Sequence, residues 1–505
     1  MRSQIMNPYL PSFEYVPDGE PHVFGDRVYV YGSHDRFDGA EFCLNDYICY
    51  SAPVTDLTDW RYEGVIFRKV QDPRNQNVPA DAKPFGPGFA AKSVYEPKDL
   101  NDPGIHAMFA PDVCKGADGR YYLYYCLDFL PEIGVAVCDT PAGAYEFYGF
   151  VQHADGTPLG AGEGDPFQFD PGVFLDDDGQ AYLYSGNAPI RLGWCGEDHY
   201  SQVMRLESDM RTLREEPRRL MPDLRNAEGT GYEGHEFFEA SSIRKIGGKY
   251  YFVYSSVRSH ELCYAVSDKP DEGYVYGGTI VDIGDIFLNG RTAADTVNCT
   301  GNTHGGIECI NGEWYVFYHR QTNRTQYSRQ ACAEKIFFQP DGSIPQVEVT
   351  SQGMNRGALA GKGMYGARIA CHLTRGGTNV ESLPGVMKMD YPYFTQDGND
   401  FDPTPENVAA DRECPVQYIT NILDGSRIGF KYFAFEGSRL KSIRVRGKAK
   451  GVLEVEGCGN IAIDVDADEW VDVAVDIPMQ DGVQALYFVY HGEGALQWHS
   501  FTFED

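Results

Sequence analysis

The stretch Gly119-Arg-Tyr-Tyr-Leu-Tyr-Tyr125 decides the fold, because its turn glycine followed by a short aromatic strand recurs along the chain. Four other stretches have this form: Gly25-Asp-Arg-Val-Tyr-Val-Tyr31, Gly179-Gln-Ala-Tyr-Leu-Tyr-Ser185, Gly248-Lys-Tyr-Tyr-Phe-Val-Tyr254 and Gly312-Glu-Trp-Tyr-Val-Phe-Tyr318. Successive glycines lie 94, 60, 69 and 64 residues apart, which is enough for a four-stranded antiparallel sheet with its loops. Five such sheets around one axis form a five-bladed β-propeller, in which closure protects the strand edges. We expect this propeller over residues 1–350.

A different pattern follows residue 350. A glycine-rich passage leads into alternating apolar and polar residues at 440–446, 451–456, 460–465 and 485–490. This alternation is typical of an antiparallel β-sandwich. The sequence therefore predicts an all-β protein, with the propeller followed by a linker and a jelly-roll sandwich over residues 351–505.

Composition narrows the possible functions. The chain has 43 Lys and Arg against 74 Asp and Glu, a formal net charge of −31, which argues against nucleic acid as a partner. No stretch approaches the ~20 apolar residues that a bilayer requires, and the first residues lack the apolar core of a secretory signal. Thirteen cysteines occur without a C-x-x-C pair, so we expect reduced thiols and a soluble, cytoplasmic protein without a membrane partner.

A polar residue stands seven to nine positions before each repeat glycine, in an otherwise apolar run. These residues are Asp18, Asp112, Asp170, Glu239 and His304. The innermost strand of each blade lines the central channel, so equivalent positions are expected to meet at one mouth. Carboxylates crowded in a partly desolvated funnel have raised pKa values, which is a property of catalytic sites.

Two carboxylates that face a sugar are the minimum equipment for glycoside hydrolysis. One protonates the leaving oxygen, and the other activates water or attacks directly. The acid needs a raised pKa, and a third carboxylate nearby supplies the negative charge that raises it.

Four motifs in this order resemble glycoside hydrolase family 43: Asp18-Gly-Glu-Pro-His-Val-Phe24, Phe109-Ala-Pro-Asp112, Phe169-Asp-Pro-Gly-Val-Phe-Leu-Asp-Asp-Asp-Gly179 and Phe238-Glu239. The resemblance covers the whole repeat region and implies a five-bladed propeller glycosidase. The final stretch from Ala485 to Phe503 resembles the closing strands of a family 6 carbohydrate-binding module.

The resemblance implies roles for three carboxylates. Asp18 corresponds to the general base, Glu239 to the general acid, and Asp170 to the aspartate that orients the acid and keeps its pKa high. The family inverts the anomeric configuration, so the carboxyls of Asp18 and Glu239 are expected roughly 6.5–9.5 Å apart. Glu20, which is followed by proline as the family's base usually is, is the alternative base.

The resemblance also implies contacts around the sugar. Phe109 replaces the family's tryptophan as an apolar wall, and Asn302 and Arg329 are expected near the substrate. His304 corresponds to a channel histidine that contacts a cation or water beneath the sugar. Asp112 either joins the catalysis or fixes a loop through hydrogen bonds to the backbone.

We therefore expect an inverting exo-glycosidase that removes arabinofuranosyl residues from plant cell-wall polysaccharides or oligosaccharides, an α-L-arabinofuranosidase. A β-xylosidase of the same mechanism is the close alternative. From other classes, the alternatives are a catalytically silent sugar-binding propeller and a protein-binding scaffold. No cofactor is required, although a structural Ca²⁺ or another cation in the channel, held by His304, is possible. Specificity is expected to depend on loops such as 66–108.

Overall fold

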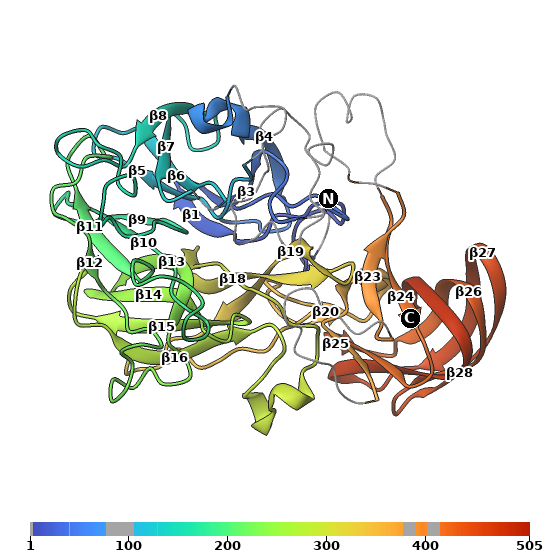
Figure 1. Cartoon of the computed structure of the whole chain (residues 1–505). Coiled ribbons are helices and arrows are strands. Elements are labelled where there is room, and N and C mark those ends of the chain that lie inside the picture. The colour runs from blue at the N-terminus through green and yellow to red at the C-terminus, as the bar shows by residue number, and fades with distance from the viewer. Residues whose placement is uncertain are drawn as a thin grey trace.

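The computed structural model describes residues 4–39, 41–76, 106–128, 130–376, 390–398, 400 and 415–504. Figure 1 shows two parts, a wheel of small sheets and a strand-rich domain beside it. The described residues contain strands and short 3₁₀ turns but no α-helix, and none of their helices is long and apolar enough to cross a membrane. All their cysteines are unpaired. Residues 77–105, most of the loop on which specificity was expected to depend, lie outside the described residues.

The wheel is a five-bladed β-propeller, as predicted. The first blade holds β1 (Glu20–Phe24), β2 (Arg27–Tyr31), β3 (Tyr47–Pro53) and β4 (Arg61–Phe67), and the second β5 (Asp112–Lys115), β6 (Tyr121–Cys126), β7 (Ile133–Cys138) and β8 (Glu146–Phe150). The third holds β9 (Gly172–Leu175), β10 (Ala181–Ser185), β11 (Gln202–Leu206) and β12 (Arg218–Arg219), and the fourth β13 (Phe237–Ile246), β14 (Lys249–Ser256), β15 (Glu261–Ser267) and β16 (Val275–Asp282). The fifth holds β17 (Ile307–Ile310), β18 (Glu313–Thr322) and β19 (Thr325–Ile336). Short 3₁₀ turns lie at η1 (Lys69–Gln71), η2 (Pro73–Asn75), η4 (Leu288–Gly290), η5 (Ala293–Asp295) and η6 (Ala367–Ile369).

The repeated aromatic stretches form the second strand of each blade. Each opens with its glycine in the left-handed region, with φ between 67° and 88° at Gly25, Gly119, Gly179, Gly248 and Gly312. Their side chains alternate between two cores: Tyr121, Leu123 and Tyr125 pack toward the first blade, whereas Tyr122 and Tyr124 pack toward the third. These strands are buried on both faces, so they are apolar throughout.

The inner strands close a ring. β1 contacts β5 and β17, β9 contacts β5 and β13, and β13 contacts β17. Five hydrophobic clusters fill the five interfaces between blades. The inner strands therefore surround one central channel.

The N-terminal segment completes the fifth blade. The backbone N–H of Tyr9 donates to the carbonyl of Ala331 on β19 at 3.3 Å, and that of Asn7 donates to Ser351 at 2.9 Å. Ile5, Tyr9 and Leu10 belong to the cluster between the fifth and first blades. The ring is thus closed by segments from its two ends.

Replacing Asn7 by alanine is expected to destabilise this closure. The Asn7 amide donates to Ala333 O (3.0 Å), Glu334 Oε1 (2.8 Å) and Thr350 O (3.1 Å), and it accepts from the Ala333 N–H. Asn7→Ala removes all four hydrogen bonds, and each buried group that is left without another partner costs about 1–3 kcal/mol before relaxation; Glu334 Oε1 keeps the Thr350 N–H and the Tyr318 hydroxyl. Denaturant unfolding followed by tryptophan fluorescence should show a lower midpoint. An unchanged midpoint would mean that the segment contributes nothing to closure.

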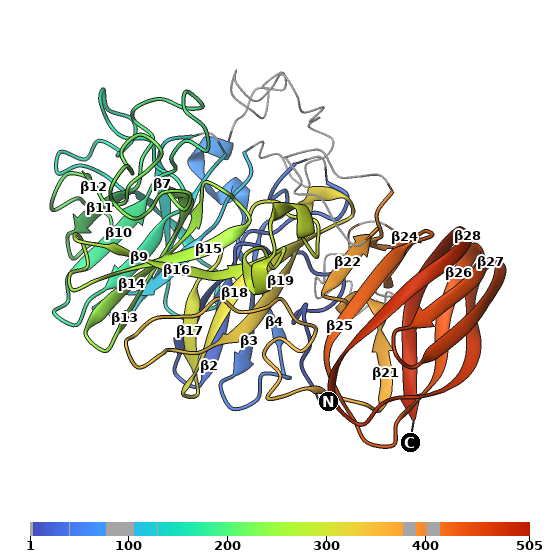
Figure 2. The ribbon, with the colours of Figure 1, turned by 90° about the horizontal axis from the view of Figure 1, so that it is seen from below.

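The C-terminal domain encloses its own core. Its strands are β20 (Leu359–Ala360), β21 (Gly363–Gly366), β22 (His372–Arg375), β23 (Tyr393–Gln396), β24 (Gln417–Ile422), β25 (Ser426–Phe435), β26 (Arg439–Val455), β27 (Gly459–Pro478) and β28 (Gly482–Glu504). They form one branched nine-stranded sheet around one hydrophobic cluster. Figure 2 shows the domain beside the fifth blade. Its strand β23 contacts β18 of that blade.

One detail of this domain differs from the expectation. Residues 440–446 and 451–455 belong to one strand, β26, because the register shift at Gly447 (φ 117°) lets the strand continue. Trp498 is fully buried and packs on Phe430 and Phe488. It is therefore a core residue.

Candidate active site

The five polar positions of the repeat lie at equivalent places in the blades. Asp18 and Asp170 stand two residues before inner strands β1 and β9, and His304 stands three residues before β17. Asp112 is the first residue of β5, and Glu239 is the third residue of β13. Each blade begins with its inner strand, so all five positions lie at the same end of the channel.

Asp18 is a buried carboxylate held in the charged form. Arg329 Nη1 donates to Asp18 Oδ1 at 3.0 Å. Burial by itself raises the pKa of Asp18, but the charge of Arg329, with contributions from His319 and His304, outweighs it and lowers the pKa below its ordinary value. Asp18 therefore has the protonation state of a general base.

Glu239 has the opposite tendency. Burial, followed by the negative charges of Asp170 and Asp18, raises the pKa of Glu239 well above its ordinary value. The attraction of Arg329 is too weak to reverse this shift. Glu239 therefore retains its proton near neutral pH, as a general acid requires.

Asp170 connects the acid to His304. Its Oδ2 lies 3.3 Å from His304 Nδ1. Burial and the charge of Asp18 raise the pKa of Asp170 despite the opposing effect of His304. Burial would lower the pKa of His304, but the charges of Asp170 and Asp18 raise it. Asp18, Asp170, Glu239 and His304 thus form one electrostatically coupled group.

The expected substrate contacts border this group. The Phe109 ring lies edge-on to Phe42 and Phe169, with centroids 6.4 and 5.8 Å away, and together they form an aromatic wall. Asn302 Oδ1 is buried without a hydrogen-bond partner among the described residues. Arg329 is buried and directs its guanidinium at carboxylates rather than at solvent.

Asp112 and Glu20 have other partners. Asp112 accepts from the backbone N–H groups of Val113 (2.6 Å) and Val173 (2.7 Å), so it joins the second and third blades. Glu20 Oε1 lies 2.8 Å from Arg244 Nη2, and burial raises the pKa of Glu20 in spite of that pairing.

Two functional residues were not singled out in the sequence. Asp35 accepts from Arg329 Nε at 2.8 Å and from Nη2 at 2.9 Å, and it is fully buried. His319 lies on β18 with its Nδ1 3.3 Å from the Asp18 backbone nitrogen. His319 directly follows the aromatic stretch that ends at Tyr318, and Asp35 stands four residues after the stretch that ends at Tyr31. A polar group continuing such a strand is the signal that marks them.

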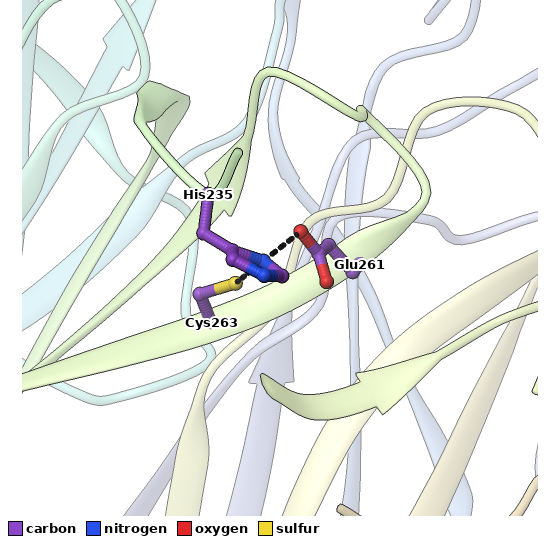
Figure 3. A group of neighbouring side chains, drawn as sticks. All are labelled: His235, Glu261 and Cys263. Atoms are coloured by element: carbon purple, nitrogen blue, oxygen red, sulfur yellow. Dashed lines mark hydrogen bonds and ion pairs between the residues drawn. The ribbon is translucent and has the colours of Figure 1, made fainter. Parts of the chain in front are cut away.

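A separate cluster lies on the fourth blade (Figure 3). The ligand atoms of His235, Glu261 and Cys263 lie within 4.8 Å of one another. Glu261 accepts from His235 Nδ1 at 2.7 Å and from Thr279 Oγ1 at 2.8 Å, and Arg258 Nε lies 3.7 Å from it. The Glu261 carboxylate already accepts these hydrogen bonds, and the positive charge of the Arg258 guanidinium would repel a metal cation. The cluster is therefore a set of hydrogen bonds that fixes the segment leading into β13.

Replacing Asp170 by asparagine is expected to shift the alkaline limb of the activity profile to lower pH. The Asp170 charge helps to raise the pKa of Glu239, so its removal lets the acid lose its proton earlier. The kcat/KM of Asp170→Asn should be measured across pH, with Asp155→Asn, an exposed turn position, as control. An unmoved alkaline limb would show that Asp170 does not act on the acid.

The fold and this group of carboxylates define a glycoside hydrolase. The sequence model described as "Glycosyl hydrolases family 43" matches residues 16–344, and the chain belongs to this family. It is 48% identical to a protein named "Xylosidase/arabinosidase" from Thermoclostridium stercorarium, over 99% of each chain. It is 24% identical to an "Arabinoxylan arabinofuranohydrolase" from Paenibacillus polymyxa, over 96% of this chain and 70% of the relative.

The propeller also resembles solved structures. A GH43 enzyme from Xanthomonas citri, solved in complex with xylose, matches with a TM-score of 0.50 and 24% identity. The match covers 68% of this chain and 94% of that chain, and it supports the fold. Glycosidases of this family need no cofactor.

Proposed function

We propose that the chain is an inverting, exo-acting glycosidase that removes terminal α-L-arabinofuranosyl residues, with β-xylosidase activity at the same site as the second candidate. The observation that carries the proposal is the contrast between two channel carboxylates: Arg329 Nη1 donates to the buried Asp18 at 3.0 Å and favours its charged form, whereas the surroundings of the partly buried Glu239, with Asp170 and Asp18 nearby, favour its protonated form. The Thermoclostridium stercorarium relative, whose name gives both activities, supports both candidates.

The reaction is a single displacement. Asp18 takes a proton from water, whose oxygen forms a bond to the anomeric carbon on the face opposite the leaving group. The glycosidic C–O bond breaks as Glu239 donates its proton to the leaving oxygen. Asp170 keeps the acid protonated, and the product sugar has the inverted configuration. Glu20 is the weaker candidate for the base, because burial raises the pKa of Glu20 in spite of its pairing with Arg244, whereas the pKa of Asp18 is lowered.

The sugar is expected to rest against the aromatic wall. Phe109 presents an apolar surface suited to the C–H face of a pentose. Asn302 Oδ1 offers a buried acceptor that a sugar hydroxyl would satisfy, which removes the cost of an unpaired group.

Turnover of 4-nitrophenyl α-L-arabinofuranoside and β-D-xylopyranoside tests the proposal. We expect hydrolysis of at least the arabinofuranoside, and proton NMR should show the inverted anomer first. Retention of configuration would refute single displacement. Sugar binding without turnover of either substrate, or of arabinoxylan oligosaccharides, would favour the silent binding propeller.

A channel cation would need Glu20, His22 and Asp112, whose ligand atoms lie within 4.8 Å of one another. His304 Nδ1 faces Asp170 instead. These donors do not match the six to eight oxygens that Ca²⁺ prefers. No step of the proposed reaction uses a cation, so treatment with EDTA is expected to leave kcat unchanged.

A further inference from the structure

His319 has a fixed tautomer. It lies on β18, is fully buried, and its Nε2 is 2.7 Å from the backbone carbonyl of Asn302. A carbonyl oxygen only accepts hydrogen bonds, so Nε2 must carry a proton. Burial, followed by the positive charge of Arg329, lowers the pKa of His319 to about 3, so this is the ring's single proton near neutral pH.

Nδ1 is consequently a hydrogen-bond acceptor. It lies 3.3 Å from the backbone nitrogen of Asp18, whose N–H donates to it. The Asp18 carboxylate is also near, with Oδ1 3.4 Å from Nδ1, but two acceptors form no hydrogen bond. The carboxylate is instead held by Arg329. Asp18 is therefore fixed at two separate points, its N–H by His319 and its carboxylate by Arg329.

The backbone at Asp18 needs such support. Its φ is 57°, in the left-handed region, which is sterically disfavoured for residues with a Cβ. The chain is tightly packed here, since a Cβ on Gly32 would lie 2.4 Å from the carbonyl oxygen of Pro17. A buried N–H without an acceptor would add a further penalty. His319 supplies that acceptor at the strained residue itself.

We propose that His319 is a positioning residue for the general base: a neutral imidazole, oriented by the Asn302 carbonyl, that holds the Asp18 backbone so that the carboxylate meets the attacking water. The proposal rests on the proposed function, which assigns the base role to Asp18. The charged and titratable groups around the imidazole are Asp18, Arg329 and His304. In the proposed reaction His319 transfers no proton to any of these three groups.

Two amide variants separate this role from simple packing. In asparagine the amide oxygen stands one bond beyond Cγ, where histidine has Nδ1, so His319→Asn can accept from the Asp18 N–H. In glutamine the amide stands one bond farther, so His319→Gln can donate to Asn302 but offers no acceptor at the Nδ1 position. His319→Leu lacks both groups.

We expect His319→Gln and His319→Leu to lose about 10²-fold in kcat, with KM little changed, because the base is misplaced while the sugar pocket remains. His319→Asn should recover most of this loss. The alkaline limb, which reports Glu239, should not move in any variant. Equal losses in the Asn and Gln variants, or losses that follow the melting temperature, would overturn the proposal.

The tautomer has a test that does not depend on turnover. Histidine-selective ¹⁵N labelling of the wild type, with the His319 signals assigned by difference from His319→Asn, should show a protonated Nε2 and a bare Nδ1 that do not titrate from roughly pH 4 to 8. A protonated Nδ1 would refute the inference even if the enzyme is active. If no glycoside is hydrolysed while the tautomer is as expected, the proposed function fails and the geometry stands.

Discussion

Replacing Glu239 by glutamine is expected to lower kcat by about 10²–10⁴-fold on glycosides with poor leaving groups, such as arabinoxylan oligosaccharides. The reason is that the amide cannot protonate the departing oxygen. The loss on 4-nitrophenyl glycosides should be much smaller, since nitrophenolate leaves without a proton. Steady-state kinetics on both substrate types measures the contrast.

The pH profile of the same variant provides a second readout. The acid works only while protonated, and its raised pKa places its loss of function on the alkaline limb. Glu239→Gln should therefore flatten that limb and leave the acid limb, which reports Asp18. Glu228→Gln, at an exposed position of the preceding loop, is the matched control. Full activity of Glu239→Gln on arabinoxylan oligosaccharides would assign the acid role elsewhere.

Replacing Arg329 by methionine is expected to affect stability and activity together. The guanidinium is shared by two buried carboxylates, Asp18 and Asp35, and removing one partner of a buried pair costs about 3–5 kcal/mol. The loss of its charge also raises the pKa of Asp18, so the base is protonated sooner as pH falls. The acid limb of kcat/KM should therefore move to higher pH.

The sign of the stability effect follows from the lowered pKa of Asp18. A carboxyl with a depressed folded-state pKa stabilises the protein above its unfolded-state pKa, and this stabilisation is lost as pH falls through the folded-state value. Arg329→Met should therefore differ most from wild type near neutral pH and least in acid. Denaturant unfolding at several pH values measures this difference.

Two further variants interpret that result. Arg439→Met removes an exposed arginine paired with Asp476, and it should leave the unfolding midpoint nearly unchanged. Adding Asp35→Asn to Arg329→Met removes one unpaired charge and should restore part of the stability. If Arg329→Met is as stable as Arg439→Met, the buried network does not stabilise the fold.

The architecture of the propeller was predictable because its signal is local. The second strand of each blade is buried on both faces. It therefore appears in the sequence as an aromatic run that follows a glycine in the left-handed region, and this pattern occurs five times. The N-terminal segment that completes the fifth blade has no such pattern. It pairs with β19 more than 300 residues later, and Asn7-Pro-Tyr9 carries no strand periodicity.

The candidate site was predictable only in part, because only some of its residues belong to a local sequence pattern. The repeat positions of Asp18, Asp170 and Glu239 are fixed by the blade pattern, and the coupled pKa shifts of these residues agree with that placement. Asp35 lies 294 positions from the arginine that it holds, and His319 lies 301 positions from the backbone N–H that it accepts. A polar residue after a repeat strand marks each as a candidate, but local sequence does not show which distant group it pairs with.

The closure of the wheel by segments from its two ends bears on how the enzyme is made. Asp18 is synthesised early, but the guanidinium and imidazole that hold it arrive 311 and 301 residues later. We therefore expect that a nascent chain on the ribosome hydrolyses no glycoside until its fifth blade has left the exit tunnel and packed against the first blade. Catalytic competence then arises in one late step, which makes the onset of activity during translation a direct report of ring completion.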